Sequence, residues 1–161
     1  MANIVFNCAL GRVTELYKRV DASDPTNAVL VIAAFNTSAT DATLRDLDTI
    51  AAMESDGNTA EATNSGYSRK VLSDSDLAAF SPDDTNNKAI LFITDQTWTS
   101  VAASPGAWTD LCVAYDSDST GGADSAIEPL TLHDFAVTPD GSDITADFDG
   151  TNGFYQASSA A

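Results

Sequence analysis

The longest uninterrupted apolar stretch of the chain is Ala28–Phe35, which contains no polar side chain. A stretch of strand length without polar alternation is typical of a strand that is buried on both faces. Lys88–Thr94, with the sequence KAILFIT, and Asp110–Tyr115, with the sequence DLCVAY, have the same character. The pattern therefore predicts buried strands at these three places.

Two later segments alternate between polar and apolar side chains. Asp143–Phe148 has polar residues at its odd positions and apolar residues at its even positions, which predicts a strand with one face in the core. Pro129–Thr138 also alternates, but its phase changes at His133–Asp134, which predicts a β-bulge there. Shorter strands are expected at Tyr67–Leu72 and, paired around a glycine, at 4–9 and 12–20.

One segment has the spacing of an amphipathic helix. A polar start at Ser38–Asp41 precedes it, and the sequence predicts a helix over about residues 41–54. Its apolar residues recur at helical intervals: Leu44, Leu47, Ile50 and Ala51. A single helical turn is expected after Ser73–Asp76.

Six to eight short strands, one helix and turns rich in Asp, Gly and Pro predict a mainly β fold. It is expected to resemble a sandwich or a barrel with one amphipathic α-helix, on the border of the α+β class. At 161 residues, the length suits one domain, for which we take residues 1–155. The small and polar residues 156–161 are expected to form a flexible tail.

Charge restricts the partners. The chain has 24 acidic and 7 basic residues, for a formal net charge of −17, and its last 73 residues hold 11 acidic groups and no Lys or Arg. Proteins that bind nucleic acids or anionic lipids need Lys and Arg to neutralise phosphates. Direct binding of DNA, RNA or a membrane surface is therefore disfavoured.

No apolar stretch approaches the roughly 20 residues that cross a bilayer. The segment MANIVFN at the N-terminus lacks the basic start and the small-residue cleavage site of a signal peptide. We therefore expect synthesis and folding in the cytoplasm.

Few residues offer catalytic chemistry. His133 is the single histidine, and no nucleophile motif accompanies it, so a structural role is favoured over a catalytic triad. Cys8 and Cys112 both lie in apolar segments and are expected to be buried free thiols. The sequence therefore predicts a protein that is not an enzyme and needs no cofactor.

One loop has the spacing of calcium ligands. Asp116, Asp118, Thr120 and Asp124 stand at positions 1, 3, 5 and 9, with glycine at position 6. Position 12, where a calcium loop has a bidentate glutamate, is Ile127. A solvated turn is favoured over a calcium site, which stays the alternative.

Two kinds of residue could anchor a protein interface. Trp98 and Trp108 bracket a loop and could be interface anchors or core side chains. Arg12 and Arg19 could likewise dock on an acidic partner or be scattered surface charge.

Several segments together are similar to those of a family of virion structural proteins of tailed bacteriophages and prophages. They cover most of the chain: GRVTELYKRV (11–20), TDATLRDLDTIAAM (40–53), YSRKVLSDSDLAAFSPDDTNNK (67–88), the long segment from Trp108 to Phe148, and GFYQA (153–157).

The resemblance implies a structural protein of the virus particle, most simply a decoration (cement) protein that bridges subunits of the major capsid protein. It implies no catalytic residues. Acidic surfaces are repelled by packaged DNA, which favours the outer surface of the capsid. By analogy with other decoration proteins, a homotrimer is expected. A head-tail connector or a tail protein stays an alternative, and an acidic DNA mimic is a weaker one.

Overall fold

The computed structural model describes residues 3–148 and 150–158. In this part of the chain the fold is mainly β, as predicted, and its strands pair in antiparallel fashion. The strands are β1 (Ile4–Val5), β2 (Val29–Thr37), β3 (Thr59–Glu61), β4 (Lys70–Leu72), β5 (Lys88–Leu91), β6 (Gln96–Trp98), β7 (Trp108–Asp116), β8 (Glu128–Val137), β9 (Ile144–Ala146) and β10 (Tyr155–Ser158). The helices are α1 (Val13–Asp21), α2 (Asp41–Arg45) and α3 (Ile50–Ser55), with short 3-10 turns η1 (Asn7–Ala9), η2 (Asp74–Asp76) and η3 (Asp124–Ala126).

The central sheet has the strand order β1-β8-β7-β2-β3, and β4 also pairs with β2. The long strands β2, β7 and β8 form its middle, where Ile32 lies opposite Val113 and Cys112 lies opposite Leu132. Nearly every residue of β2 and β7 is buried, which explains why their sequences are apolar without alternation.

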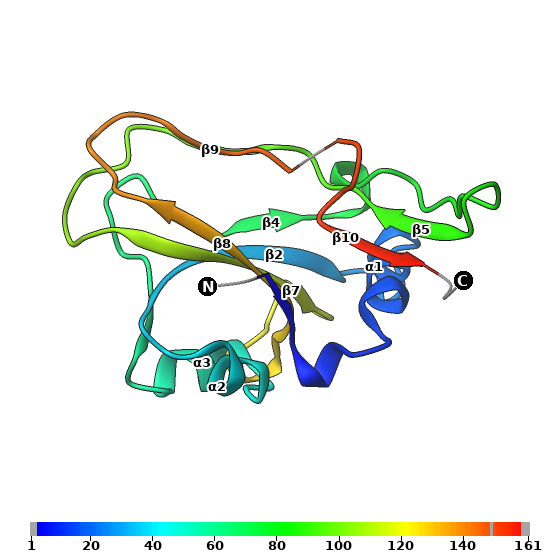
Figure 1. Ribbon diagram of the computed structural model, residues 1–161, viewed down its shortest axis with the longest axis horizontal. Helices are drawn as coiled ribbons and strands as arrows, with labels where there is room; N and C mark the ends of the chain where they lie inside the picture. Colours follow the sequence, from blue (N-terminus) through cyan, green and yellow to red (C-terminus); the bar gives the residue numbers. More distant parts are fainter. Residues whose placement is uncertain (1–2, 149, 159–161) are drawn as a thin grey trace.

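Other elements cover both faces of this sheet. Figure 1 shows α2 and α3 on one side and β9 on the other. β9 pairs with β6, and β10 pairs with β5 in a second two-stranded ribbon. The result is a layered β structure with one continuous core. No helix in the described part of the chain has the length and apolar character to cross a bilayer.

Residues 13–21 form α1, so the strand predicted over 12–20 is wrong, and β1 pairs with β8 instead of with that segment. The buried residues of α1 are Val13, Leu16, Tyr17 and Val20, which recur every three or four positions. That interval matches the helix repeat and places all four on the face toward the core. The Tyr17 hydroxyl also donates to the backbone oxygens of Ala78 and Phe92, at 2.6 and 2.8 Å, which fixes α1 against the β5 side.

The helix predicted over 41–54 is interrupted, and residues 3–148 and 150–158 contain three α-helices where one was predicted. α2 ends at Arg45, and α3 begins only after Thr49, whose hydroxyl accepts a hydrogen bond from the Ala52 amide at 3.0 Å. Thr is a good N-cap and a weaker interior residue, so Thr49 starts a new helix rather than continuing the first.

Most predicted strands are confirmed, with changed ends, but β5 is only partly buried where a strand buried on both faces was predicted. In β8 the register against β7 is irregular between Asp134 and Val137, directly after the predicted bulge. The short strand β3, which pairs with β2, was not predicted. The prediction of a flexible tail is wrong for residues 156–158, which belong to β10. Residues 159–161 lie outside the described part of the chain.

Candidate functional site

Both tryptophans lie in the core, so the anchor interpretation is wrong for them. Trp98 and Trp108 are each 1% exposed, and their rings pack edge to face with centroids 5.3 Å apart. The indole N–H of Trp98 donates to the Ser68 backbone oxygen at 2.7 Å, and that of Trp108 donates to the Asn64 side-chain oxygen at 2.9 Å. Buried indoles with satisfied N–H groups are core residues of the sheet.

The candidate calcium loop does not bring its four predicted ligands together. Asp116 accepts a hydrogen bond from the Asp118 amide at 2.9 Å, and Asp118 accepts two from Thr120. Asp124 instead pairs with Arg69. Among residues 3–148 and 150–158, no group of three or more His, Cys, Asp or Glu side chains is arranged to hold a metal ion.

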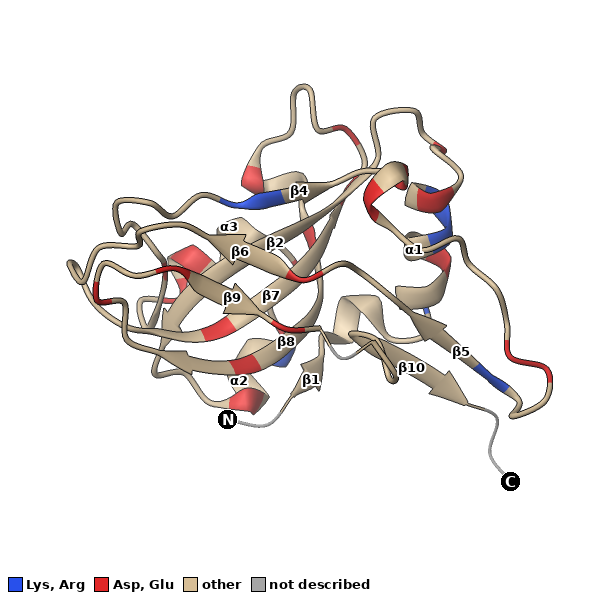
Figure 2. Cartoon of the chain, turned by 90° about the horizontal axis from the view of Figure 1, so that it is seen from above, with Lys and Arg blue, Asp and Glu red and all other residues tan. Residues whose placement is uncertain are grey.

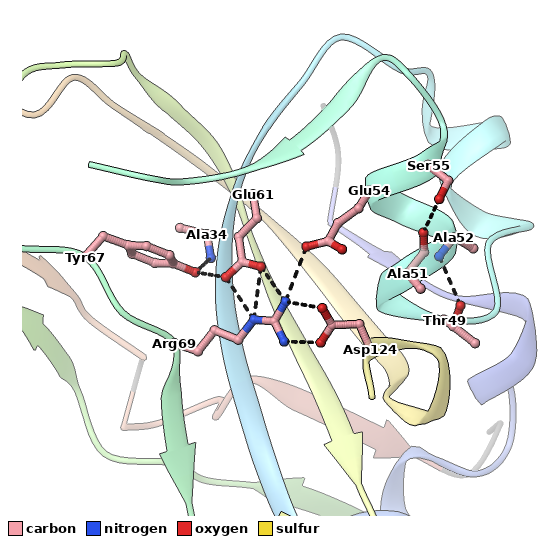
Figure 3. Close-up of polar contacts among 10 residues, drawn as sticks. All are labelled: Ala34, Thr49, Ala51, Ala52, Glu54, Ser55, Glu61, Tyr67, Arg69 and Asp124. Carbon is pink, nitrogen blue, oxygen red and sulfur yellow. Dashed lines mark hydrogen bonds and ion pairs between the residues drawn. The ribbon is translucent and has the colours of Figure 1, made fainter. Parts of the chain in front are cut away.

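Arg69 is the centre of an ion cluster that sequence reasoning missed (Figure 3). Its guanidinium binds Glu61 in a bidentate manner, contacts both oxygens of Asp124 and lies 3.4 Å from Glu54. The Tyr67 hydroxyl donates to Glu61 at 2.7 Å and accepts from the Ala34 amide at 3.0 Å. The cluster therefore joins β2, β3, α3 and η3.

The pKa shifts in this cluster follow from burial and from the shared cation. Hydrogen bonds from Arg69 lower the pKa of Asp124, and the bond to Glu61 raises the pKa of Arg69 itself. Burial raises the pKa of Glu54, and the nearby Asp124 raises it further. Three carboxylates bound to one guanidinium fix the segments that carry them. The paired residues are at least eight positions apart in sequence, so no local motif could reveal the cluster.

His133 and the two cysteines have packed surroundings. Burial lowers the pKa of His133 to about 4, and its Nε2 lies 2.9 Å from the Thr131 hydroxyl. The Cys8 thiol donates to the Pro129 backbone oxygen at 3.4 Å, and burial raises its pKa to about 11. Cys112 is fully buried, and its pKa is raised for the same reason. Thiols with raised pKa values are poor nucleophiles at neutral pH.

The start of α1 and its solvent-facing side carry three of the chain's seven cations. We call five exposed residues there the α1 surface: Leu10 and Arg12 before the helix, and Glu15, Lys18 and Arg19 on it. Leu10 is 62% exposed, which is rare for a large apolar side chain here. Among the described residues only Val71, on β4, is comparable, at 55%.

Ion pairs hold the two arginines of the α1 surface in place. Arg12 lies 2.8 Å from Glu128 on β8, and Arg19 lies 2.9 Å from Glu15 one turn earlier. Both arginines stay about half exposed, at 48% and 46%. They can therefore still donate to a partner. Figure 2 shows acidic positions all around the chain and Lys or Arg at only a few places, α1 among them.

Comparison with family models, with curated proteins and with solved structures found no match.

Proposed function

We propose that the chain is a structural protein of a tailed bacteriophage particle that decorates the outer surface of the capsid and bridges subunits of the major capsid protein. The sequence resemblance supports the virion assignment. The charge supports the outer surface, because a chain with net charge −17 is repelled by packaged DNA.

The exposed Leu10, two residues before the half-exposed Arg12, is the observation that favours a docking role. Protein interfaces are organised around a few apolar or Arg anchors that lose their water on binding, and a polar rim surrounds them. The α1 surface offers both components and carries three of the chain's seven cations. An acidic patch on the capsid would complement it.

The same surface could serve a head-tail connector or a tail protein, which form the second candidate class. Copy number distinguishes these classes from a decoration protein. An acidic DNA mimic would need carboxylates spaced like phosphates along one face. The acids here lie mainly in turns around the chain, which weighs against a mimic. Assembly as a homotrimer rests on analogy with other decoration proteins.

Rebinding to stripped capsids tests the proposal. The protein and its Leu10→Ser and Arg12→Gln variants are added to particles from which it has been removed, and occupancy is measured against protein concentration. Because these side chains are exposed, the melting temperature should hardly change, while the affinity should fall about tenfold or more.

Val71→Ser is the matched control, because Val71 is also an exposed apolar side chain but lies on β4. Its occupancy should equal that of the unmodified protein. Equal occupancy of all variants would contradict docking through the α1 surface. Stripped particles should also lose their integrity at a lower temperature than decorated ones, and equal heat resistance would contradict the cement role.

A further inference from the structure

Strand β10 lies at the rim of the molecule (Figure 2). Among the described residues it pairs only with β5, in a ribbon of two strands, and no other described segment forms backbone hydrogen bonds with it. Ribbons of two strands are marginally stable in water, and an open edge presents unpaired N–H and C=O groups to another extended chain. The outer edge of β10 is therefore a candidate place for the addition of a strand.

The hydrogen bonds of β5 show which of its backbone groups face β10. Lys88 exchanges two backbone hydrogen bonds with Asp83, 2.8 and 3.1 Å long, so its groups point away from β10. Backbone groups alternate in direction along a strand, and the next residue, Ala89, therefore faces β10. Ala157 lies opposite Ala89 in the register and bonds to β5. The residues on either side of Ala157 consequently direct their N–H and C=O groups outward.

The two outward residues, Gln156 and Ser158, suit a second copy of the same strand. When two β10 strands lie antiparallel with their Ala157 residues opposite each other, Gln156 of each copy faces Ser158 of the other. Each such pair exchanges two hydrogen bonds, so the contact uses every outward backbone group of these residues. A single two-fold axis relates the copies and closes the contact, as in other isologous interfaces.

Charge also favours β10 as the place where two copies meet. Two chains of net charge −17 repel each other, and a contact between acidic loops would add to this repulsion. Residues 150–158 contain no charged side chain. The outer strands β3 and β4 are three residues long and carry Glu61 and Lys70, which protect an edge from pairing. β10 has four residues and neither a charge nor a proline.

We propose that β10 pairs in antiparallel fashion with β10 of a second copy of the chain, so that the two ribbons form one sheet with the order β5-β10-β10-β5. The contact is small, so it is weak in dilute solution and forms where copies are concentrated. It is independent of the proposed function, because it uses no residue of the α1 surface. A two-fold contact can join copies that belong to neighbouring trimers, so it is compatible with the expected homotrimer.

A cysteine at the two-fold axis tests the register. The two Ala157 residues would form a non-hydrogen-bonded pair with Cα atoms about 4.5 Å apart, a distance that a disulfide spans. Ala157→Cys should therefore give a disulfide-linked dimer under mild oxidation, measured by gel electrophoresis without reductant. Gln156→Cys is the matched control, because its side chain is more exposed but its two copies stand out of register. It should cross-link about tenfold more slowly. Equal rates, or no dimer of Ala157→Cys, would overturn the proposal.

A proline tests the hydrogen bonds. Gln156→Pro removes an outward N–H but no hydrogen bond to β5, so its melting temperature should stay close to that of the unmodified protein. Sedimentation equilibrium compares the two proteins at increasing concentration. The average molar mass of the unmodified protein should rise more steeply with concentration than that of Gln156→Pro. Equal dependence on concentration in the two proteins would overturn pairing through β10.

Discussion

Arg69 and Glu61 form a bidentate ion pair, in which the Nε of the arginine donates to Oε1 at 2.9 Å and its Nη2 donates to Oε2 at 2.5 Å. The same guanidinium also binds Asp124 from η3. Segments that are 8 and 55 positions away from Arg69 in sequence are thereby joined at one charged group. The pair is only partly exposed, at 24% for Arg69 and 15% for Glu61, so its loss should be felt in stability.

Arg69→Met is expected to lower the free energy of unfolding by about 2 kcal/mol, because it leaves partly buried carboxylates without their cation. Urea unfolding measures this. Arg19→Met is the control, since Arg19 makes an exposed pair within one helix, and it should leave the urea unfolding curve nearly unchanged. Equal effects of the two substitutions would show that the cluster adds nothing beyond a surface pair.

Trp98→Ala is expected to destabilise the fold by about 3 to 5 kcal/mol, because a fully buried indole is replaced by a cavity. The control is Val71→Ala at an exposed site, which should change stability by less than about 0.5 kcal/mol. Thermal and urea unfolding measure both. A Trp98→Ala protein as stable as the original would mean that the indole is not part of the core.

Calcium at millimolar concentration is expected to leave the melting temperature unchanged. Asp124 is held by Arg69, and Asp118 accepts hydrogen bonds within its own turn. A ligand that bound only the folded state would raise the melting temperature by mass action. A rise that depends on calcium and disappears in Asp116→Asn would restore the calcium interpretation.

Stability should depend on pH through His133. Its pKa in the folded protein, about 4, lies below the unfolded value of about 6.5, so the unfolded state binds the proton first. Stability is therefore lost as the pH falls from about 6.5 toward 4. Between pH 7 and 4.5 this loss should be about 2 kcal/mol larger in the unmodified protein than in His133→Gln. Unfolding curves of the two proteins that shift in parallel with pH would contradict the burial of this ring.

Strands whose sequences reflect burial could be predicted from the chain alone. β2 and β7 are apolar because both of their faces are covered, and β9 alternates because one face is exposed. α1 was predicted as a strand although its buried positions have helical spacing. Its charged residues interrupt the apolar pattern and obscure the repeat.

Features that depend on distant pairing could not be predicted. Residues 156–158 are small and polar, and only the partner strand β5 gives them a fixed place. The ion cluster joins Asp124 to Glu54, Glu61 and Arg69, and these last three look like ordinary surface charge in the sequence. Asp124 has the spacing of a calcium ligand along the chain, but in the fold its carboxylate binds Arg69, 55 positions away.

Copy number in purified particles tests the proposed decoration role most directly. Quantitative mass spectrometry of virions would compare this chain with the major capsid protein. A decoration role predicts hundreds of copies per particle, in a fixed ratio to the capsid subunits. It also predicts that the protein can be removed without opening the tail junction. Six or twelve copies would contradict decoration and favour a connector, and absence from the particles would contradict a virion role altogether.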